Sequence, residues 1–407
     1  MIKPESLLKD KNIAIVGAGI VGACCAAHLS ACGAKVTVFD RSMPGLAGPS
    51  RGNAAHIAAS AIFPLASPGI ILEALPMLLD PKAPLKMPLG QWPKLMPWLV
   101  SFMLNANHRT YRENINKLGE FNRDAHLDTE QLYQTAGLSD CLRRDGALYV
   151  YESRASLQKS HQEFAARRRF GFDCQALSAE QLYQLEPGLA KIFSGGYLLP
   201  QWMTVGDPKK VVSGLMAYCT GQGGQFVCEE ISELTSSGHG VKVCFKNGNS
   251  AGFDQAIVAA GLHSTPLVKK LGQKKLLTAE RGYNLTYTRP GVAVNRAIMF
   301  ADRGVVATRV DDGLRIGGWA ELVSDDIPVN QAYFSRINAI ARELFPALNT
   351  TEHYPWMGAR PSTPDSLPVV ERSEADANIV YAFGHGHLGL TQGATTAKKV
   401  AQLLAPG

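Results

Sequence analysis

The decapeptide IAIVGAGIVG, residues 13–22, determines the architecture of this chain of 407 residues. Its first four residues are a short β run closed by glycine. The apolar residues 21–32 predict a helix that ends at Gly33, and residues 36–39 predict a second strand. The strand, the glycine turn, the helix and the second strand together form one βαβ unit at the start of the chain.

Three glycines in this unit form the pattern G-x-G-x-x-G, which in this context is typical of a dinucleotide site. Gly17 permits the tight turn, Gly19 leaves room for a pyrophosphate, and Gly22 lets the helix pack against the strand. The helix N-terminus supplies amide donors to phosphates. Asp40, at the end of the second strand, can accept hydrogen bonds from ribose hydroxyls, and its charge disfavours a 2′-phosphate. The structural alternative is a glycine-rich turn without a ligand.

The choice between FAD and NAD depends on the sequence after Asp40. An NAD-dependent dehydrogenase usually continues with further α/β units. This chain continues with a long irregular and helical insertion, then β-rich segments, then a second glycine cluster near the C-terminus. A cofactor domain that is interrupted by a substrate domain and completed by the chain end favours FAD. An NAD-binding dehydrogenase stays an alternative.

Composition limits the function classes. The length predicts two or three domains. A net charge of +6 mildly favours anionic substrates or anionic lipid and does not indicate nucleic acid. The eight cysteines form no C-x-x-C pair, which predicts reduced thiols and no metal site. The apolar run at residues 13–34 contains glycines and His28 and leads into a strand, so we predict neither a secretion signal nor a transmembrane helix.

Residues 70–105 form an apolar segment with two tryptophans, three lysines and six prolines. The proline spacing predicts short helices rather than one long helix. Two interpretations stay open. The short helices pack over the edge of a domain, or the segment contacts a membrane surface or a lipid-soluble electron acceptor. We therefore expect a cytoplasmic protein, with peripheral contact to the inner face of the cell membrane under the second interpretation.

The remaining pattern predicts an α/β chain: a Rossmann-like FAD-binding domain interleaved with an α+β substrate domain that contains an antiparallel sheet. Strands are expected at 146–151, 283–287, 314–319 and 379–383, and helices at 332–344 and 391–404. Residues 1–69, 205–265 and 350–407 are assigned to the FAD-binding domain. Residues 70–204 and 266–349 are assigned to the substrate domain.

Further motifs follow the fingerprint in a fixed order over nearly the whole chain. They are SRGNAAH at 50–56, DPKAPL at 80–85 with WLVSF at 98–102, VAAGLHS at 258–264, GARPSTPD at 358–365 running to 370, and GHGHLGLT at 384–391. With these motifs the chain resembles the D-amino-acid oxidase/dehydrogenase family of flavoproteins, and within it the bacterial D-amino-acid dehydrogenases. Three positions depart from the family pattern: Ala55 replaces a frequent glycine, His56 a common glutamine, and Glu371 a usual glycine.

The resemblance implies FAD as the cofactor and assigns residues to it. The glycines at 384–391 lie between a strand and a helix, where backbone amides come close to a ligand. The family places this segment at the flavin ring, where amide donors stabilise negative charge on reduced flavin. The predicted cofactor residues are Gly17, Gly19, Gly22, Asp40, Arg41, Ser50, Asn53, Gly261, Arg360, Gly386, Leu388, Gly389 and Thr391.

The resemblance also implies hydride transfer from the substrate Cα to the flavin, which gives an imino acid that water hydrolyses to a keto acid. A substrate carboxylate needs a cation, and arginine offers a bidentate fork. Arg281 and Arg309 are the candidates in the β-rich region, Tyr283 can add a hydroxyl donor, and His56 follows as a further candidate. His387, like the neighbouring His385, is a candidate contact to flavin or substrate. A purely structural role is an equal alternative for the arginines and histidines of this set.

The predicted function is FAD-dependent oxidative deamination of a D-amino acid, with D-proline or a hydroxyproline as cyclic candidates. Electrons pass to a quinone or another acceptor. Two alternatives stay open: an amino-acid oxidase that uses oxygen, and a flavoprotein that acts as a maturation partner of another protein without small-molecule turnover.

Overall fold

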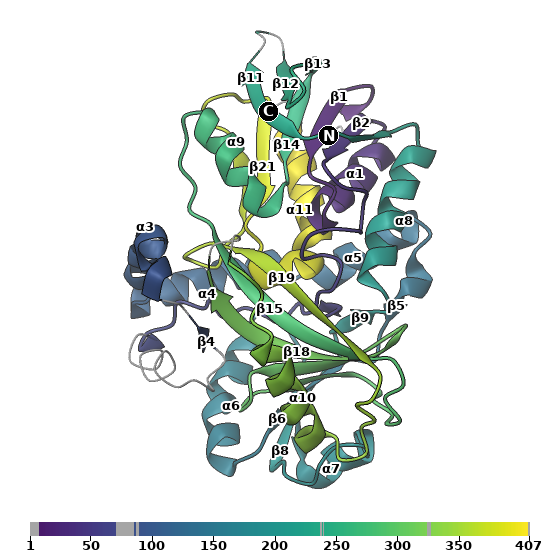
Figure 1. Cartoon of the computed structure of the whole chain (residues 1–407), viewed down its shortest axis with the longest axis vertical. Coiled ribbons are helices and arrows are strands. Elements are labelled where there is room, and N and C mark those ends of the chain that lie inside the picture. The colour runs from purple at the N-terminus through teal and green to yellow at the C-terminus, as the bar shows by residue number, and fades with distance from the viewer. Residues whose placement is uncertain are drawn as a thin grey trace.

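A computed structural model describes residues 8–70, 85–86, 89–236, 238, 240–323 and 327–405. Two sheets dominate it, one in the upper and one in the lower half of Figure 1. The upper sheet has six strands in the order β10-β2-β1-β14-β21-β20. These are β10 (Gln225–Cys228), β2 (Lys35–Asp40), β1 (Asn12–Val16), β14 (Gln255–Val258), β21 (Ile379–Phe383) and β20 (Val369–Arg372). Only β20 runs antiparallel to its neighbour.

Both faces of the six-stranded sheet are covered, so its central strands are apolar throughout. Ile13 and Ile15 face a layer of helices, whereas Ala14 and Val16 face the opposite layer. The helical layer contains α1 (Ile20–Ala31), α5 (Ala125–Thr135), α8 (Pro208–Gly221) and α11 (Gly389–Leu404). The opposite layer contains the three-stranded sheet of β11 (Ile231–Ser236), β12 (Val241–Phe245) and β13 (Ser250–Phe253), with α9 (Ser264–Lys270).

The lower sheet has nine strands in the order β19-β15-β18-β17-β16-β6-β8-β7, and β4 pairs with β18. They are β19 (His353–Ser362), β15 (Thr278–Tyr287), β18 (Gly313–Leu322), β17 (Val305–Val310), β16 (Ala297–Phe300), β6 (Ala147–Tyr151), β8 (Gly195–Leu199), β7 (Gln175–Ser178) and β4 (Leu85–Lys86). The pairs β16–β6 and β18–β4 are parallel and the others antiparallel. Helix α10 (Ala332–Leu344) packs on one face.

The remaining elements join and flank the two sheets. A small sheet of β3 (His56–Ile57), β9 (Met203–Val205) and β5 (Leu142–Arg143) lies between them (Figure 1). The other helices are α3 (Trp92–Asn105), α4 (His108–Asn122), α6 (Arg154–Arg169) and α7 (Ala179–Leu185). Short 3-10 helices are η2 (Leu89–Gln91), η3 (Ser139–Cys141), η4 (Gly261–His263) and η5 (Gly386–Leu388).

The structure confirms the predicted fold class and most predicted elements. The helix at 332–344 and the strand at 379–383 have the predicted bounds. The prediction that prolines keep the helices of 70–105 short is wrong for α3, which continues through Pro97. Pro93 lies in the first turn, where no backbone donor is needed. Past Pro97, Trp98 anchors the helix by donating its indole N–H to the Ser362 carbonyl at 2.9 Å.

The predicted division into two domains stays a prediction. The strands of the six-stranded sheet fall in the segments assigned to the FAD-binding domain. Strand β19, which lies in the predicted segment 350–407, pairs instead with β15 in the nine-stranded sheet. Residues 80–84 of the DPKAPL motif, and most of 70–88, lie outside the described residues.

Substitution of the fingerprint glycines tests how tightly α1 packs. A Cβ at Gly22 would lie 1.9 Å from the Gly17 carbonyl oxygen, whereas the nearest atom to a Cβ at Gly19 is the Ser50 hydroxyl at 3.6 Å. We expect Gly22→Ala to lower the free energy of unfolding by about 3 kcal/mol or more and Gly19→Ala to leave it near the wild-type value. Urea unfolding of the cofactor-free protein measures both, and equal losses would contradict this packing.

Acid should destabilise the protein through His385, which precedes η5. Burial lowers the pKa of His385 to about 3, and its Nε2 pairs with the Thr396 hydroxyl at 2.8 Å. The unfolded chain protonates near pH 6.5. The stability that depends on neutral His385 is therefore fully present above pH 6.5. It is lost as the pH drops toward 3, and the loss is about 2 kcal/mol at pH 5. Urea unfolding of cofactor-free protein at pH 7.5 and pH 5 should show a smaller loss for His385→Gln. The exposed His353→Gln control should keep the wild-type loss.

Candidate active site

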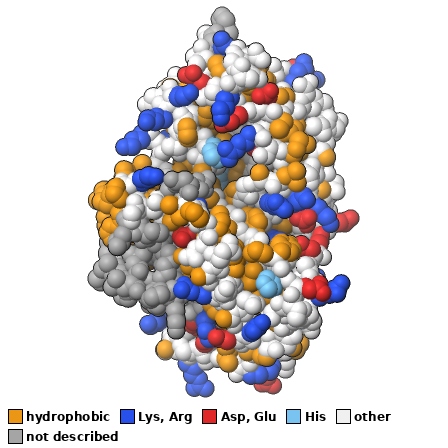
Figure 2. Space-filling model, in the orientation of Figure 1, with side chains coloured by type: hydrophobic (Ala, Val, Ile, Leu, Met, Phe, Trp, Pro, Cys, Tyr) orange, Lys and Arg blue, Asp and Glu red, His pale blue; other side chains and the backbone are white. Residues whose placement is uncertain are grey.

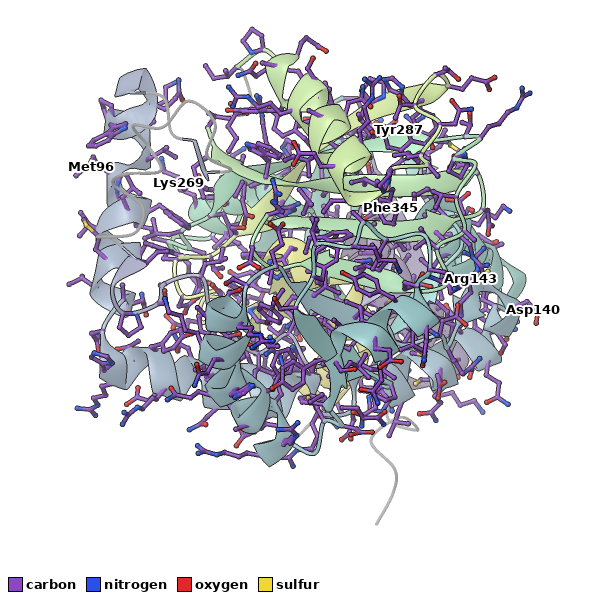
Figure 3. The ribbon with its side chains drawn as sticks, turned by 90° about the horizontal axis from the view of Figure 1, so that it is seen from below. Met96, Asp140, Arg143, Lys269, Tyr287 and Phe345 are labelled. Atoms are coloured by element: carbon purple, nitrogen blue, oxygen red, sulfur yellow. The ribbon has the colours of Figure 1, made fainter. Side chains whose placement is uncertain are left out.

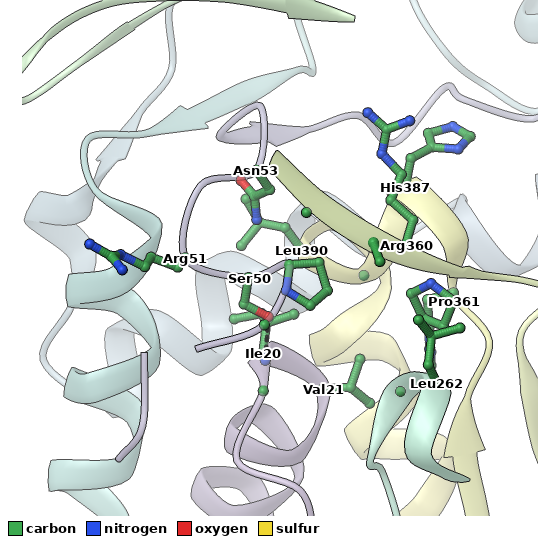
Figure 4. A pocket seen from close by; sticks show the side chains of 18 of the residues that line it. Ile20, Val21, Ser50, Arg51, Asn53, Leu262, Arg360, Pro361, His387 and Leu390 are labelled. Atoms are coloured by element: carbon green, nitrogen blue, oxygen red, sulfur yellow. Dashed lines mark hydrogen bonds between the residues drawn. The ribbon is translucent and has the colours of Figure 1, made fainter. Parts of the chain in front are cut away.

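A cavity of about 1140 Å³ lies where the carboxyl ends of β1, β2, β14 and β21 face the nine-stranded sheet. Ligands bind at such strand ends in open α/β sheets. All predicted cofactor residues except Gly22 line the cavity, as do His56, Tyr283 and His387. Figure 4 shows Ile20 and Ser50 at the start of α1, with Arg360 and His387 at another side of the same space.

The turn before α1 is shaped to receive a phosphate group. Positions 17 and 22 are closed to side chains by neighbouring backbone, but a Cβ at Gly19 would meet no backbone atom and would fill the space before the helix. The Ile20 amide donates to the Ser50 hydroxyl at 3.1 Å, and the Ala18 amide donates to the Asp40 carboxylate at 2.8 Å. Amides at a helix N-terminus beside a fixed carboxylate fit the pyrophosphate and ribose of a dinucleotide.

The cavity continues past Asp40 to a polar end. Arg41 and His263 face each other there, with 2.6 Å between the guanidinium and the imidazole Nε2. Lys246, Lys270 and Glu230 also line this end. This end of the cavity therefore carries charges of both signs.

The segment 50–58 lines the cavity from the fingerprint onward and is tied to its surroundings. The Asn53 side chain accepts a hydrogen bond from the Ala55 amide at 2.7 Å, and Thr391 accepts one from the Ala58 amide at 2.9 Å. Ala55 has φ of 60°, in the left-handed region that favours glycine. This backbone conformation explains why glycine is frequent at the same position in the family.

The positive charge of Arg360 is compensated by the carboxylate of Glu280. Its guanidinium pairs with Glu280 at 2.9 Å, and the Ser362 hydroxyl donates to the same carboxylate at 2.6 Å. Burial raises the pKa of Glu280, but Arg360, His387 and these hydrogen bonds outweigh it and hold the pKa below its ordinary value. A Cβ at Gly282 would lie 2.1 Å from the Arg360 guanidinium, so the glycine makes room for this arginine in the cavity.

The two arginines predicted to bind a carboxylate do not line the cavity. Side chains alternate along a strand, and the cavity lies on the side of Gly282 and Asn284 in β15. Arg281 points to the other face, where it donates to the Ile327 carbonyl at 2.6 Å. On β17, Thr308 lines the cavity, whereas Arg309 is half exposed and lies 3.9 Å from Asp145.

Tyr283 lies in the cavity wall, but its hydroxyl is used elsewhere. The ring packs against Tyr333 and Phe334 under α10, and the hydroxyl donates to Glu321. Tyr283 is therefore held among the residues on the far face of the sheet, together with Arg281. The Tyr283 hydroxyl already donates its proton to Glu321, so it is not available for the predicted hydrogen bond to the substrate.

His56 faces the cavity in a neutral state. Its Nε2 pairs with the Thr308 hydroxyl, which donates to the Ala54 carbonyl at 2.9 Å. Since this hydroxyl proton is committed to a carbonyl, His56 donates from Nε2 and keeps a lone pair on Nδ1. Burial and then the nearby Arg315 lower the pKa of His56 to about 4. The imidazole lies 5.9 Å from the ring of Trp202.

Several residues that line the cavity beside His56, a part that we call the chamber, were not predicted from the sequence: Tyr149, Trp202, Met299, Arg315, Trp319 and Trp356. Trp319 combines a left-handed φ of 65° with a buried indole N–H that has no hydrogen-bond partner among the described residues. Such strain in an aromatic residue is uncommon and concentrates at functional sites. Strand alternation could have indicated that Arg315 faces the cavity. It lies two positions before Gly317 and therefore on the same side of β18.

Comparison with known proteins agrees with this geometry. A family model described as FAD dependent oxidoreductase (DAO) matches residues 12–403. A protein named D-amino-acid oxidase from Bradyrhizobium diazoefficiens is 30% identical over 403 residues, which cover 98% of this chain and 96% of that protein.

Solved structures share the fold at low sequence identity. Glycine oxidase from Geobacillus kaustophilus has a TM-score of 0.73 at 19% identity, covering 97% of this chain and 95% of that one. L-proline dehydrogenase from P. horikoshii has a TM-score of 0.70 at 14% identity, covering 97% and 93%. Because the family model spans nearly all of the sequence and the cavity fits a dinucleotide, the chain belongs to the DAO family of FAD-dependent oxidoreductases, with FAD as its cofactor.

Proposed function

We propose that the chain catalyses the FAD-dependent oxidative deamination of a D-amino acid. One observation carries the proposal: a single cavity joins the dinucleotide fingerprint to a chamber that holds both aromatic side chains and arginine. A bound flavin would supply the acceptor for the hydride that leaves the substrate Cα, while the Cα–N bond becomes the imine double bond. The D configuration is supported by the relative named D-amino-acid oxidase.

The chamber favours a substrate with an apolar or cyclic side chain. Its walls are formed by Tyr149, Trp202, Met299, Val306 and Trp319. Most of this surface lacks charge, so a charged side chain would lose its hydration without a partner. A five-membered ring such as that of D-proline or a hydroxyproline fits this chemistry, and these substrates stay part of the proposal.

His56 orients the substrate amine in this proposal. The Nδ1 atom makes no hydrogen bond within the described residues and can accept one from the substrate amine. The Thr308 hydroxyl holds the ring in place through Nε2. Arg360 and His387 stay proposed cofactor and substrate contacts, because both line the cavity next to Glu280.

Helix α3 is the part of the described chain that we propose for contact with a membrane surface and a quinone acceptor. One face of the helix exposes Trp92, Met96, Val100, Met103 and Leu104, with Leu104 at 72%. The spacing of three to four residues places them on one stripe. Figure 2 shows hydrophobic side chains gathered at the edge over α3, and Met96 points outward in Figure 3. No described helix is long and apolar enough to cross a membrane.

The reaction can be tested by anaerobic reduction of the flavin. We expect D-proline, hydroxyproline or another apolar D-amino acid to bleach the flavin absorbance faster than its L enantiomer, because the amine, carboxylate and side chain occupy fixed positions in the chamber. Gly19→Val, whose side chain would fill the phosphate space, should purify without FAD and serves as the flavin-free control. If no free amino acid reduces the flavin, a role as a maturation partner gains support.

The acceptor is tested on the same reduced protein. A soluble quinone analogue should reoxidise it much faster than oxygen does. Efficient reoxidation by oxygen alone would instead support the oxidase alternative.

The α3 surface is tested by sedimentation with anionic phospholipid vesicles. Met96→Glu together with Val100→Glu should weaken vesicle binding at least tenfold, since each apolar side chain contributes about 1.5–3 kcal/mol when it leaves water. Leu127→Glu on α5, which replaces an exposed leucine away from α3, is the control and should bind like the wild type. Vesicle binding that survives the double substitution would rule out this surface.

A further inference from the structure

Three arginines among the described residues are more than nine-tenths buried, and one of them lacks a counterion. Arg281 is 1% exposed and lies 3.8 Å from Glu321. Arg167 is 3% exposed, lies 3.5 Å from Glu163 and is surrounded by aromatic rings. Arg315 is 7% exposed and makes no ion pair with any described residue.

Neutral groups hold Arg315 in position without cancelling its charge. Its Nε donates to the Thr286 hydroxyl at 3.1 Å, and its Nη1 donates to the Asn53 carbonyl at 2.7 Å. Nη2 has no hydrogen-bond partner among the described residues. The adjacent Asp312 accepts from the Tyr354 hydroxyl instead. The guanidinium is thus fixed at two nitrogens while the third stays available.

The position of Arg315 directs this charge into the cavity. Thr286 and Thr308 flank it in register on the neighbouring strands β15 and β17. Thr308 and Gly317 line the cavity on the same side of the sheet. His56 is close enough for the guanidinium to lower its pKa. The charge therefore lies in the chamber wall near the segment 50–56.

A buried charge without a counterion is strongly unfavourable, and buried charges in proteins are normally paired or coordinate a metal. A bound ligand can supply the missing partner. The ligand must be an anion, because Arg315 is a cation at all accessible pH values. The other arginine of this chamber, Arg360, already has Glu280 as its counterion.

We propose that Arg315 is the residue that binds the substrate carboxylate. This inference deepens the proposed function and rests on it, because the anion is taken to be that of an amino acid. With the carboxylate at Arg315, the amine lies toward His56 and the side chain toward the aromatic wall. Arg315 then determines how far the substrate Cα enters the chamber.

Binding of an unreactive ring carboxylate tests the proposal without turnover. Cyclopentanecarboxylate has a five-membered ring and an anion but no amine, and cyclopentanecarboxamide is its neutral match. Titration of the FAD-loaded protein, followed by the flavin spectrum, should show a clear preference for the acid in the wild type. Arg315→Met should weaken binding of the acid about thirtyfold or more, the equivalent of about 2 kcal/mol, and should change binding of the amide little.

Two further variants keep the test decisive. Arg315→Lys keeps the charge without the planar fork, so its affinity for the acid should fall between those of Arg315→Met and the wild type even if the Met variant folds poorly. Arg289→Met replaces an arginine that is 77% exposed at its side chain and paired with Glu352 outside the cavity. This control should bind both probes like the wild type, with unchanged flavin content.

Several results would overturn the proposal. These are wild-type affinity of Arg315→Met for the acid, equal losses for acid and amide, or no preference for the acid in the wild type. Loss of acid binding in Arg309→Met alone would assign the anion to the neighbouring strand. Failure of the proposed function looks different: the acid preference would still depend on Arg315, while no amino acid would reduce the flavin.

Discussion

The close approach of Gly22 to the carbonyl of Gly17 determines how α1 lies on the six-stranded sheet. A side chain at either position would collide with backbone. Helix α1 can therefore lie directly against β1 and β14 only because both positions are glycine. This close approach places the start of α1 at the cavity, where the Ala18 amide donates to Asp40 and the Ile20 amide donates to Ser50. The same helix contacts α8 and α11, so the cofactor site and the main core share one support.

The nine-stranded sheet separates two kinds of polar chemistry by strand alternation. One face carries Arg281, Glu321 and Tyr283 in a closed network under α10, where each charge has a partner. The other face presents Asn284 and Arg315 to the cavity among aromatic walls. Binding chemistry is thus confined to the face that meets the flavin-binding half, while the opposite face stabilises the sheet.

Much of this was predictable from the sequence, and the misses have physical reasons. Helix α10 and strand β21 follow from periodicity, and the dinucleotide site follows from the spacing of glycines and Asp40. The family motifs placed most cofactor residues at the cavity. Arg281 and Arg309 were predicted as carboxylate ligands, but neither lines the cavity. The face that a strand residue occupies depends on how the strand lies in its sheet, and a bulge shifts the register of β15 against β18 between Arg281 and Tyr283. The left-handed backbone of Trp319 could not be predicted either, because the conformational preferences of tryptophan do not favour it.

The order of strands in the six-stranded sheet affects how the protein is made. β1 and α1 are synthesised well before β21, which pairs with β14, and α11, which packs on α1. These two later elements are formed by residues 379–404. Until those residues have left the ribosome tunnel, the part of α1 that α11 covers lacks its partner, although α5 and α8 precede α11 in the chain and pack on α1 as well. The six-stranded sheet is likewise incomplete until β21 is available beside β14. Incomplete states of this kind expose apolar surface and an unpaired strand edge, which makes folding intermediates prone to aggregation.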